Sequence, residues 1–295
     1  MLEIRTLSVS GELINRVYQE GSVELPQLSG DAETINSYAI LRDDADPKHT
    51  AFVYRVEGQT WRKIRPNSEL KIQGLTPRDA KQSAFVNSLV DPSVLISIAI
   101  GEAGTGKTTL ALAYAISMYM SERKRIVLCK PTSMVGEGKA FGPVPGDIQE
   151  KYAPYLHSYE IALKRILGRT HGKDHFQRML QRGDIEFVPV ELVRGSEFAD
   201  CTFILDEAQN LTWHELKSLI SRMGNNTKMI ILGDLMQIDT GARPEKTGLW
   251  KLLNSAPFRR SRIGSAIRLE AQYRSAITAL VANIDAWLKR PSSGR

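Results

Sequence analysis

The chain has 295 residues, 42% of them hydrophobic and 24% charged, a balance that supports a packed core and excludes a disordered or fibrous chain. No apolar stretch reaches the about 18 residues of a membrane-spanning helix, and no basic segment followed by an apolar run opens the chain. We therefore expect a cytoplasmic protein with no membrane partner. The net charge of +6 fits a polyanionic partner without requiring one. Both cysteines, Cys129 and Cys201, lie in apolar runs and are expected in the core.

Residues 1–75 are expected to form a small β-rich N-terminal domain. Short β-favouring runs at 37–42, 50–56 and 60–64 are separated by turn residues, which predicts an antiparallel meander. Its arginine and tyrosine side chains could contact nucleic acid, although a solvated strand face is the favoured interpretation.

A helix is expected between this region and the next strand. Thr76 followed by Pro77 predicts its start, and the apolar residues at 84–89 its buried part. Gln82 then lies shortly before a glycine-rich stretch at 101–106. A glutamine amide can both donate to and accept from an adenine edge, so Gln82 is either a base-reading residue or a surface residue of the helix.

The glycine-rich stretch follows an apolar run at 94–100, a predicted buried strand, and precedes a predicted helix at 109–116. Its pattern is Gly, four free residues, then Gly-Lys-Thr, which predicts a phosphate-binding loop. The glycines allow a tight turn with inward N–H groups, and the helix dipole favours phosphate. The expected nucleotide-binding residues are Gly101, Glu102, Ala103, Gly104, Thr105, Gly106, Lys107, Thr108 and Thr109.

Two side chains of this loop have predicted roles in ATP binding. Lys107 is expected to reach the β- and γ-phosphates, and the Thr108 hydroxyl to coordinate Mg²⁺. The sequence thus predicts ATP and Mg²⁺ as cofactors.

The middle of the chain alternates predicted strands and helices. Strands are expected at 125–129 and 185–190, with helices at 148–167 and 174–181 between them. The stretch at 136–147 is too rich in glycine and proline for regular structure. A loop of that length within a compact domain indicates a functional segment.

A further apolar strand is predicted at 202–205 and ends in two adjacent carboxylates, Asp206 and Glu207. Strand alternation predicts that they point to opposite faces, at the carboxyl end where open α/β sheets bind ligands. Asp206 is expected to bind Mg²⁺ opposite Thr108, directly or through a water. Glu207 is expected to orient or deprotonate the attacking water.

The next helix is predicted at 213–223, with Thr212 as its N-cap and Glu215 at the spacing of a capping box. A strand at 228–232 follows. Its apolar residues predict another buried strand of the same sheet.

Polar residues follow this strand as well. We expect Gln237 to contact the γ-phosphate, and Asp234 to hold the attacking water or a neighbouring arginine. Both positions again point to a nucleotide at the carboxyl edge of the sheet.

The last part of the chain contains a predicted strand at 265–269, a helix at 276–288 and a disordered tail at 291–295. Residues 251–275 carry six basic residues and one acidic residue, the strongest local charge bias. This bias indicates either a solvated basic face or contact with nucleic-acid phosphates, together with an arginine for the γ-phosphate.

These pieces together resemble the PhoH-like family of ATPases, whose single RecA-like domain is related to superfamily 1 helicases. The resemblance covers about residues 76–288, so a domain over 76–290 is expected. It rests on residues 101–108, on Gly138-Lys139 with Pro145-Gly146-Asp147, on Arg194-Gly195, on residues 206–210, and on Gly233-Asp234 with Gln237-Ile238-Asp239.

The resemblance implies an α/β P-loop NTPase fold, with one parallel sheet flanked by helices. It also implies ATP hydrolysis, activity linked to RNA or single-stranded DNA in some members, and a ring-shaped homo-oligomer, with a hexamer as one candidate size. Residues 1–75 resemble the segment that connects this domain to a PIN nuclease in some members. The nuclease itself is not expected, since residues before 30 lack its spaced carboxylates.

Two positions depart from the family pattern. Ser196-Glu197 follows Arg194-Gly195 where a second arginine is more usual, and Lys130 precedes Pro131 where arginine is usual. Lysine lacks the bidentate phosphate geometry of arginine.

The favoured interpretation is a Mg²⁺-dependent ATPase in which water attacks the γ-phosphate in line. Arg194 and Arg274 are the candidates for the arginine that completes the site, in the same subunit or in a neighbour. An RNA or DNA helicase or translocase is the alternative, although the about 55 residues after Asp239 are too few for a second RecA-like domain. A nucleotide-gated binding module with little turnover is a further alternative, and a small-molecule kinase is less favoured.

Overall fold

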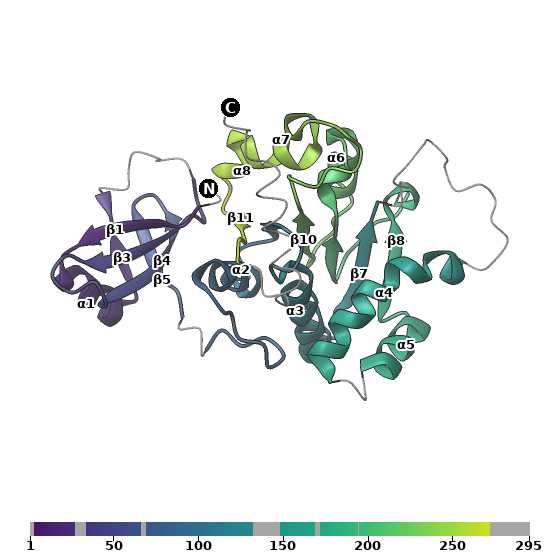
Figure 1. The fold of residues 1–295 in the computed structure, drawn as a ribbon, viewed down its shortest axis with the longest axis horizontal. Coiled ribbons are helices and arrows are strands. Elements are labelled where there is room, and N and C mark those ends of the chain that lie inside the picture. The colour runs from purple at the N-terminus through teal and green to yellow at the C-terminus, as the bar shows by residue number, and fades with distance from the viewer. Residues whose placement is uncertain are drawn as a thin grey trace, which may run out of the picture.

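The computed structural model describes residues 3–26, 34–65, 69–131, 148–168, 172–193 and 195–271, with only the backbone at 148–155 and 172–174. The described chain forms a five-stranded sheet near the N-terminus and a six-stranded parallel sheet with helices on both faces (Figure 1). The mixed α/β P-loop NTPase fold and the β-rich N-terminal segment expected from the sequence are both present.

The parallel sheet and its helices occupy the chain from residue 80 onward. Its strands are β6 (Ile96–Ile100), β7 (Arg125–Lys130), β8 (Ile185–Pro189), β9 (Cys201–Leu205), β10 (Lys228–Gly233) and β11 (Gly264–Arg268). The helices are α2 (Ala80–Val90), α3 (Lys107–Glu122), α4 (Ile148–Leu167), α5 (Gly172–Arg182), α6 (Trp213–Ile220), α7 (Gly248–Asn254) and α8 (Ala256–Arg259), with 3₁₀ turns at Val190–Leu192, Ala208–Asn210 and Pro244–Lys246.

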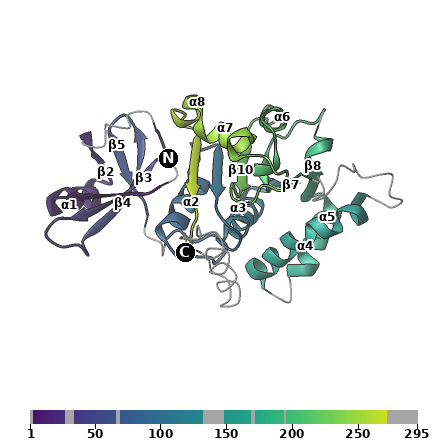
Figure 2. The same ribbon diagram turned by 45° about the horizontal axis from the view of Figure 1, so that its top comes forward.

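The strand order is β11-β6-β10-β9-β7-β8, and every pair is parallel. One face of the sheet packs against α2 to α5 and the other against α6 to α8 (Figure 2). The strand sequences are continuous apolar runs because helices cover both faces of the sheet. Cys129 and Cys201 lie in this core, as expected, and burial raises the pKa of both thiols.

The four central strands β6, β10, β9 and β7 end at the same edge of the sheet. The phosphate loop follows β6, Asp234 follows β10, Asp206 follows β9 and Lys130 ends β7. Parallel strands bring these endings together, which positions the polar residues around one point.

The N-terminal sheet only partly matches the predicted meander. The strands β3 (Tyr38–Asp43), β4 (Thr50–Glu57) and β5 (Thr60–Lys63) are antiparallel as expected. A first strand, β1 (Arg5–Val9), pairs in parallel with β3, and β2 (Ser22–Glu24) closes the other edge. The sequence analysis missed these strands and the helix between them.

That missed helix, α1 (Gly11–Glu20), has clear end signals in the sequence. The Ser10 hydroxyl caps its start by accepting from the N–H of Leu13, and Gly21 ends it in the left-handed conformation with φ 74°. Val17 and Ile14 bury its inner face against the sheet. The chain therefore passes from β1 through α1 to β2 at the opposite edge of the sheet, and β3 then pairs in parallel with β1.

The two sheets contact each other through β11 and α2. The Asn36 side chain donates to the carbonyl oxygens of Arg262 and Gly264, each at 2.9 Å. Tyr54 donates to the Asp91 carboxylate at 3.2 Å. The side chains of Tyr54 and Tyr38 belong to the same apolar cluster as α2, so the N-terminal sheet packs against the parallel-sheet region.

Some predicted helix boundaries were wrong. Asp79 rather than Thr76 caps α2, since its carboxylate accepts from the N–H of Gln82 at 2.8 Å. The capping box of Thr212 and Glu215 is confirmed, but its helix ends at Ile220. Within the described ranges, no helix has the length and apolarity to cross a membrane.

Candidate functional site

The phosphate loop connects β6 to α3 and is shaped by its glycines. Gly104 and Gly106 have φ of 91° and 93°, in the left-handed region that a side chain disfavours. Gly106 is also the N-cap of α3, and a glycine offers no side chain to cover the first helical N–H groups. The positive end of α3 therefore faces the loop in the geometry that suits an anion.

Lys107 lies against the loop and is held by its carbonyl oxygens. Its ammonium donates to the carbonyl of Gly101 and, at 2.9 Å, to that of Glu102. The Thr105 hydroxyl donates to the same Glu102 carbonyl at 2.9 Å. A Cβ at Gly101 would lie 2.1 Å from the carbonyl oxygen of Leu269, so this close approach requires glycine.

Gln82 supports the loop from α2. Its amide N–H donates to the carbonyl of Thr105 at 3.0 Å, and its amide oxygen accepts from the backbone N–H of Arg78 at 2.9 Å. The side chain is 5% exposed. Gln82 is therefore not a surface residue, and reading an adenine edge would compete with the bonds that hold the loop.

Asp206 and Thr108 meet beside the start of α3. The Thr108 hydroxyl donates to Asp206 Oδ2 at 3.5 Å, and the buried Tyr159 hydroxyl donates to the same oxygen at 3.3 Å. Burial is the main cause that raises the pKa of the Asp206 carboxyl, and the charge of Glu207 adds to it. A buried carboxylate in this state is stabilised by a cation.

The chemistry of these oxygens fits Mg²⁺. The Thr108 hydroxyl and the Asp206 carboxylate are hard oxygen donors, and Mg²⁺ in phosphate sites uses one or two protein oxygens with substrate phosphates and waters. Among the residues that the structure describes, no three histidine, cysteine, aspartate or glutamate side chains gather as a metal cluster.

The extended backbone of β9 does not continue through Glu207. Its φ of 56° lies in the left-handed region, so the predicted strand alternation does not continue through it. The result still separates the two carboxylates, because Asp206 is buried and the Glu207 side chain is 39% exposed. Glu207 Oε1 lies 3.6 Å from the Lys130 ammonium.

Gln209 connects the ends of β9 and β10. Its amide nitrogen donates to Glu207 Oε2 at 2.7 Å and to the backbone carbonyl of Gln237 at 3.0 Å. Its amide oxygen accepts from the backbone N–H of Asp234 at 2.9 Å. Gln209 is 1% exposed, so one buried amide holds three predicted site residues in place.

One carboxylate oxygen of Asp234 is buried without a hydrogen-bond partner among the described residues. Its Oδ1 accepts from the N–H of Met236 at 2.9 Å, whereas its Oδ2 has no hydrogen-bond partner within the described part of the chain. Burial is the main cause that raises the pKa of this carboxyl. A buried acceptor of this kind costs free energy unless a ligand or water satisfies it.

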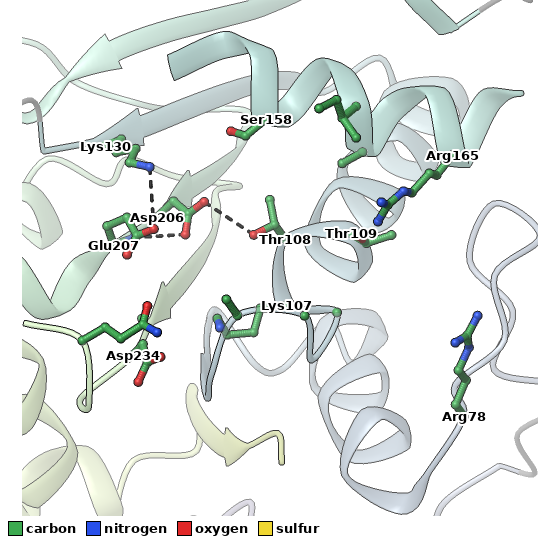
Figure 3. A pocket seen from close by; sticks show the side chains of 17 residues that line it. Arg78, Lys107, Thr108, Thr109, Lys130, Ser158, Arg165, Asp206, Glu207 and Asp234 are labelled. Carbon is green, nitrogen blue, oxygen red and sulfur yellow. Dashed lines mark hydrogen bonds and ion pairs between the residues drawn. The ribbon is translucent and has the colours of Figure 1, made fainter. Parts of the chain in front are cut away.

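The phosphate loop and the ends of β7, β9 and β10 border one cavity of about 810 Å³ (Figure 3). Figure 3 shows that it extends across the phosphate loop from the ends of β9 and β10 to α4. Its walls are formed by Arg78, Ala103, Gly104, Gly106, Lys107, Thr108, Thr109, Lys130, Ser158, Ile161, Ala162, Arg165, Asp206, Glu207, Gly233, Asp234 and Gln237. The cavity is large enough for a nucleotide.

Several residues of this site were not identified from the sequence. Tyr159 and Arg165 lie on the predicted helix α4, whose sequence carries no motif that points to a ligand. Arg78 precedes α2 and Gln209 follows the acidic pair. Only Gln209 had a usable signal, because it directly extends the Asp206-Glu207-Ala208 motif.

A family model described as PhoH-like protein matches residues 74–284 of the chain. The chain belongs to the PhoH-like family. The matched range begins shortly before α2 and contains every residue described above for the cavity. The five-stranded N-terminal sheet precedes it.

Individual family members are similar to this chain over regions of different length. A PhoH-like protein of Bacillus subtilis is 43% identical over 48% of this chain and 42% of its own length. Protein PhoH2 of the same organism is 26% identical over 95% of this chain and 63% of its own length. A PhoH-like protein of Synechocystis is 36% identical over 52% of this chain and 45% of its own length. The matched regions thus span about two fifths to three fifths of these relatives.

Solved structures give weaker similarity. The Pif1 helicase of Candida albicans matches 70% of this chain and 42% of its own, with 16% identity and a TM-score of 0.34. Domain III of the replication initiation protein DnaA of Thermotoga maritima matches 76% of each chain, with 14% identity and a TM-score of 0.30. Superpositions at this level support no conclusion about function.

Several predictions lie outside the described residues. They are the arginine candidates Arg194 and Arg274, the glycine-rich loop at 136–147, the helix at 276–288 and the tail at 291–295. Their predicted roles stay predictions.

Proposed function

We propose that this chain is a Mg²⁺-dependent ATPase. The observation that carries the proposal is the single cavity that joins the phosphate loop to Asp206, Glu207 and Asp234. Residues for holding phosphate, metal and water occur there on neighbouring elements, which is the set that phosphoryl transfer requires. The division of the chain near residue 75 belongs to the same proposal, with the ATPase domain after it.

The phosphate end of ATP would be held by the loop. The backbone N–H groups at the start of α3 would donate to phosphate oxygens. The Lys107 ammonium would exchange its bonds to the Gly101 and Glu102 carbonyls for bonds to phosphate oxygens. Thr108 and Asp206 would hold Mg²⁺, which supplies positive charge to the β- and γ-phosphate oxygens. Binding would therefore depend on both the loop and the end of β9.

Glu207 is the proposed base for the attacking water. The water oxygen forms a bond to the γ-phosphorus, the bond from that phosphorus to the β–γ bridging oxygen breaks, and ADP leaves with that oxygen. The proton of the water passes to Glu207, whose Oε2 is positioned by Gln209 at 2.7 Å. Asp234 and Gln237 border the same cavity and would hold the water or sense the γ-phosphate.

Finer parts of the proposal concern partners. We propose a homo-oligomeric ring, in which Arg194 or Arg274 acts on the nucleotide of the same or a neighbouring subunit, and coupling to RNA or single-stranded DNA. The basic stretch at 251–275 supports nucleic-acid contact only in part. Arg262 forms an ion pair with Glu57, while Lys251 and Arg268 are exposed.

Steady-state ATP hydrolysis with Mg²⁺ tests this function, measured over a range of protein concentrations with and without single-stranded RNA or DNA. Lys107→Ala should lower turnover by at least about 10³-fold, and Glu207→Gln should stop hydrolysis while ATP still binds. Equal loss of ATP binding in both variants would make Glu207 a structural residue. Tight ATP binding by the wild-type chain without turnover under every condition would favour a nucleotide-gated binding module instead.

A further inference from the structure

The two ends of the cavity differ in chemistry. Figure 3 shows Asp234 and Glu207 on one side of the phosphate loop, with Arg78 and Arg165 on the other. Thr109 lies between Thr108 and Arg165 in this view. One end thus presents carboxylates and the other presents guanidinium groups.

The phosphate loop determines which end of a nucleotide lies where. In such loops the lysine reaches the β- and γ-phosphates, and the backbone N–H groups at the start of the helix hold the α- and β-phosphates. A triphosphate would therefore run from the Glu207 end past Lys107 and Thr109. Its ribose and base would extend toward Arg78 and Arg165.

Groups that read a base edge are needed at that end if the site selects one base. The carboxylate and amide side chains on the cavity wall are those of Asp206, Glu207, Asp234 and Gln237, which follow β9 and β10 at the other end. Beside Arg165, α4 contributes Ile161 and Ala162. Among the described residues, the base end therefore presents apolar surface and cations without an amide or a carboxylate on its wall.

Gln82 does not supply the missing amide. Its amide nitrogen donates to the Thr105 carbonyl and its oxygen accepts from the Arg78 N–H, and the side chain is 5% exposed. Turning this amide to a base would remove the bond that supports the phosphate loop. The Gln82 side chain therefore supports the phosphate loop and does not hydrogen-bond to the base.

A guanidinium group that stacks on a base face, rather than donating to a base edge, binds the base without reading its identity. Its plane stacks on any base, because every base has a π-face, and its charge attracts the nucleotide phosphates. We propose that the site selects the triphosphate and not the base, binding ATP, GTP, CTP and UTP alike, with Arg78 and Arg165 holding the base end. This inference rests on the proposed nucleotide site and specifies its substrate class.

Competition binding tests the substrate class. A fluorescent ATP analogue labelled on the ribose would be displaced from the whole chain by ATP, GTP, CTP, UTP and inorganic triphosphate in separate titrations. We expect the four nucleotides to have dissociation constants within about 10-fold of each other, since sites that hydrogen-bond a defining group reject analogues by 10⁴-fold or more. Hydrolysis rates for the four nucleotides, measured in parallel, should follow the same order.

Matched variants test the arginines. Arg165→Gln and Arg78→Gln should each weaken binding of all four nucleotides by about 3- to 30-fold, and weaken inorganic triphosphate less. Lys164→Gln is the control, since this substitution removes one positive charge from the same helix. The Lys164 side chain does not border the cavity and forms an ion pair with Glu160 at 2.7 Å. Nucleotide affinity should be unchanged in the control.

The outcomes separate this inference from the proposed function. ATP bound about 100-fold or more tightly than GTP would overturn the inference and leave the ATPase proposal standing. Binding of no nucleotide would overturn both. Loss of affinity for ATP alone in Arg165→Gln, or no loss in either arginine variant, would refute the role assigned to the guanidinium groups.

Discussion

Lys228 and Asp234 lie at opposite ends of β10, and both are buried, yet their surroundings differ. At the amino end, the Lys228 ammonium donates to the backbone carbonyls of Ser88, Asp91 and Val94. At the carboxyl end, Asp234 Oδ2 has no partner within the described chain. The buried ammonium of Lys228 is thus satisfied by the protein itself, whereas one buried oxygen of Asp234 is left for another partner.

This difference indicates which buried polar groups serve stability and which serve function. A satisfied buried group stabilises the fold, whereas an unsatisfied one costs free energy, and at Asp234, which borders the cavity, that cost is expected to serve ligand binding. Substitutions at the amino end should therefore change the free energy of unfolding. Substitutions at the carboxyl end should change turnover.

Among the substitutions that compare the two ends of β10, Asp234→Asn is expected to have the largest effect. The amide keeps the acceptor for the Met236 N–H but removes the buried charge. We expect kcat for ATP to fall by about 10²-fold, while the free energy of unfolding stays equal or rises by up to about 1 kcal/mol. Chemical denaturation and steady-state kinetics on the same preparation measure both. A less stable variant with unchanged kcat would reverse the proposed contrast between the two ends.

Lys228→Met tests the amino end. The carbonyls of Ser88, Asp91 and Val94 lose their shared donor, so the free energy of unfolding should fall by about 2 kcal/mol. ATP turnover per folded molecule should not change. Arg125→Gln, which removes an exposed ion pair with Glu186, is the control and should alter stability by less than about 1 kcal/mol.

The pH dependence of stability sharpens the same comparison. Burial lowers the pKa of the Lys228 ammonium to about 7, against the attraction of Asp91. Below pH 7 the folded and unfolded states both hold the proton. Between pH 7 and about 10 the unfolded state binds more protons, so this group makes the stability rise with pH by at most about 1.4 kcal/mol per unit. The rise should be absent in Lys228→Met; an identical slope in both proteins would contradict it.

Gln209→Ala combines both kinds of effect. Glu207 loses its positioning bond, and the Asp234 N–H loses its acceptor. We expect kcat to fall by about 10-fold with little change in KM, together with a loss of about 1 kcal/mol in stability. Gln209→Glu keeps an acceptor for the Asp234 N–H but places a second buried carboxylate against Glu207, so it should restore neither stability nor turnover. Recovery of turnover by Gln209→Glu would exclude the positioning role.

The smallest effect is expected for Tyr159→Phe. Only the hydroxyl that donates to Asp206 Oδ2 is removed, and the ring remains packed. We expect the Mg²⁺ concentration for half-maximal ATP hydrolysis to change by about 3-fold with kcat nearly unchanged. A change in kcat at saturating Mg²⁺ would instead indicate that Tyr159 acts on the phosphoryl transfer itself.

Local signals predicted much of the fold. The glycines of the phosphate loop, the apolar strand runs and the capping box of Thr212 and Glu215 each act within a few residues, so their outcome follows from the sequence. The start of α2 was wrong because Thr76-Pro77 competed with a second cap at Asp79. Strand β1 was missed because its partner, β3, lies beyond a whole helix.

The sequence alone was enough to predict that a phosphate loop and an acidic strand end belong to one P-loop NTPase fold, because each motif is local and parallel strands bring their carboxyl ends together. The folded structure was needed to find that Gln82 supports the loop, that one Asp234 oxygen has no partner among the described residues, and that Arg165 borders the cavity. These properties depend on contacts between elements distant in the chain. No local pattern encodes which side chain such packing buries, satisfies or exposes.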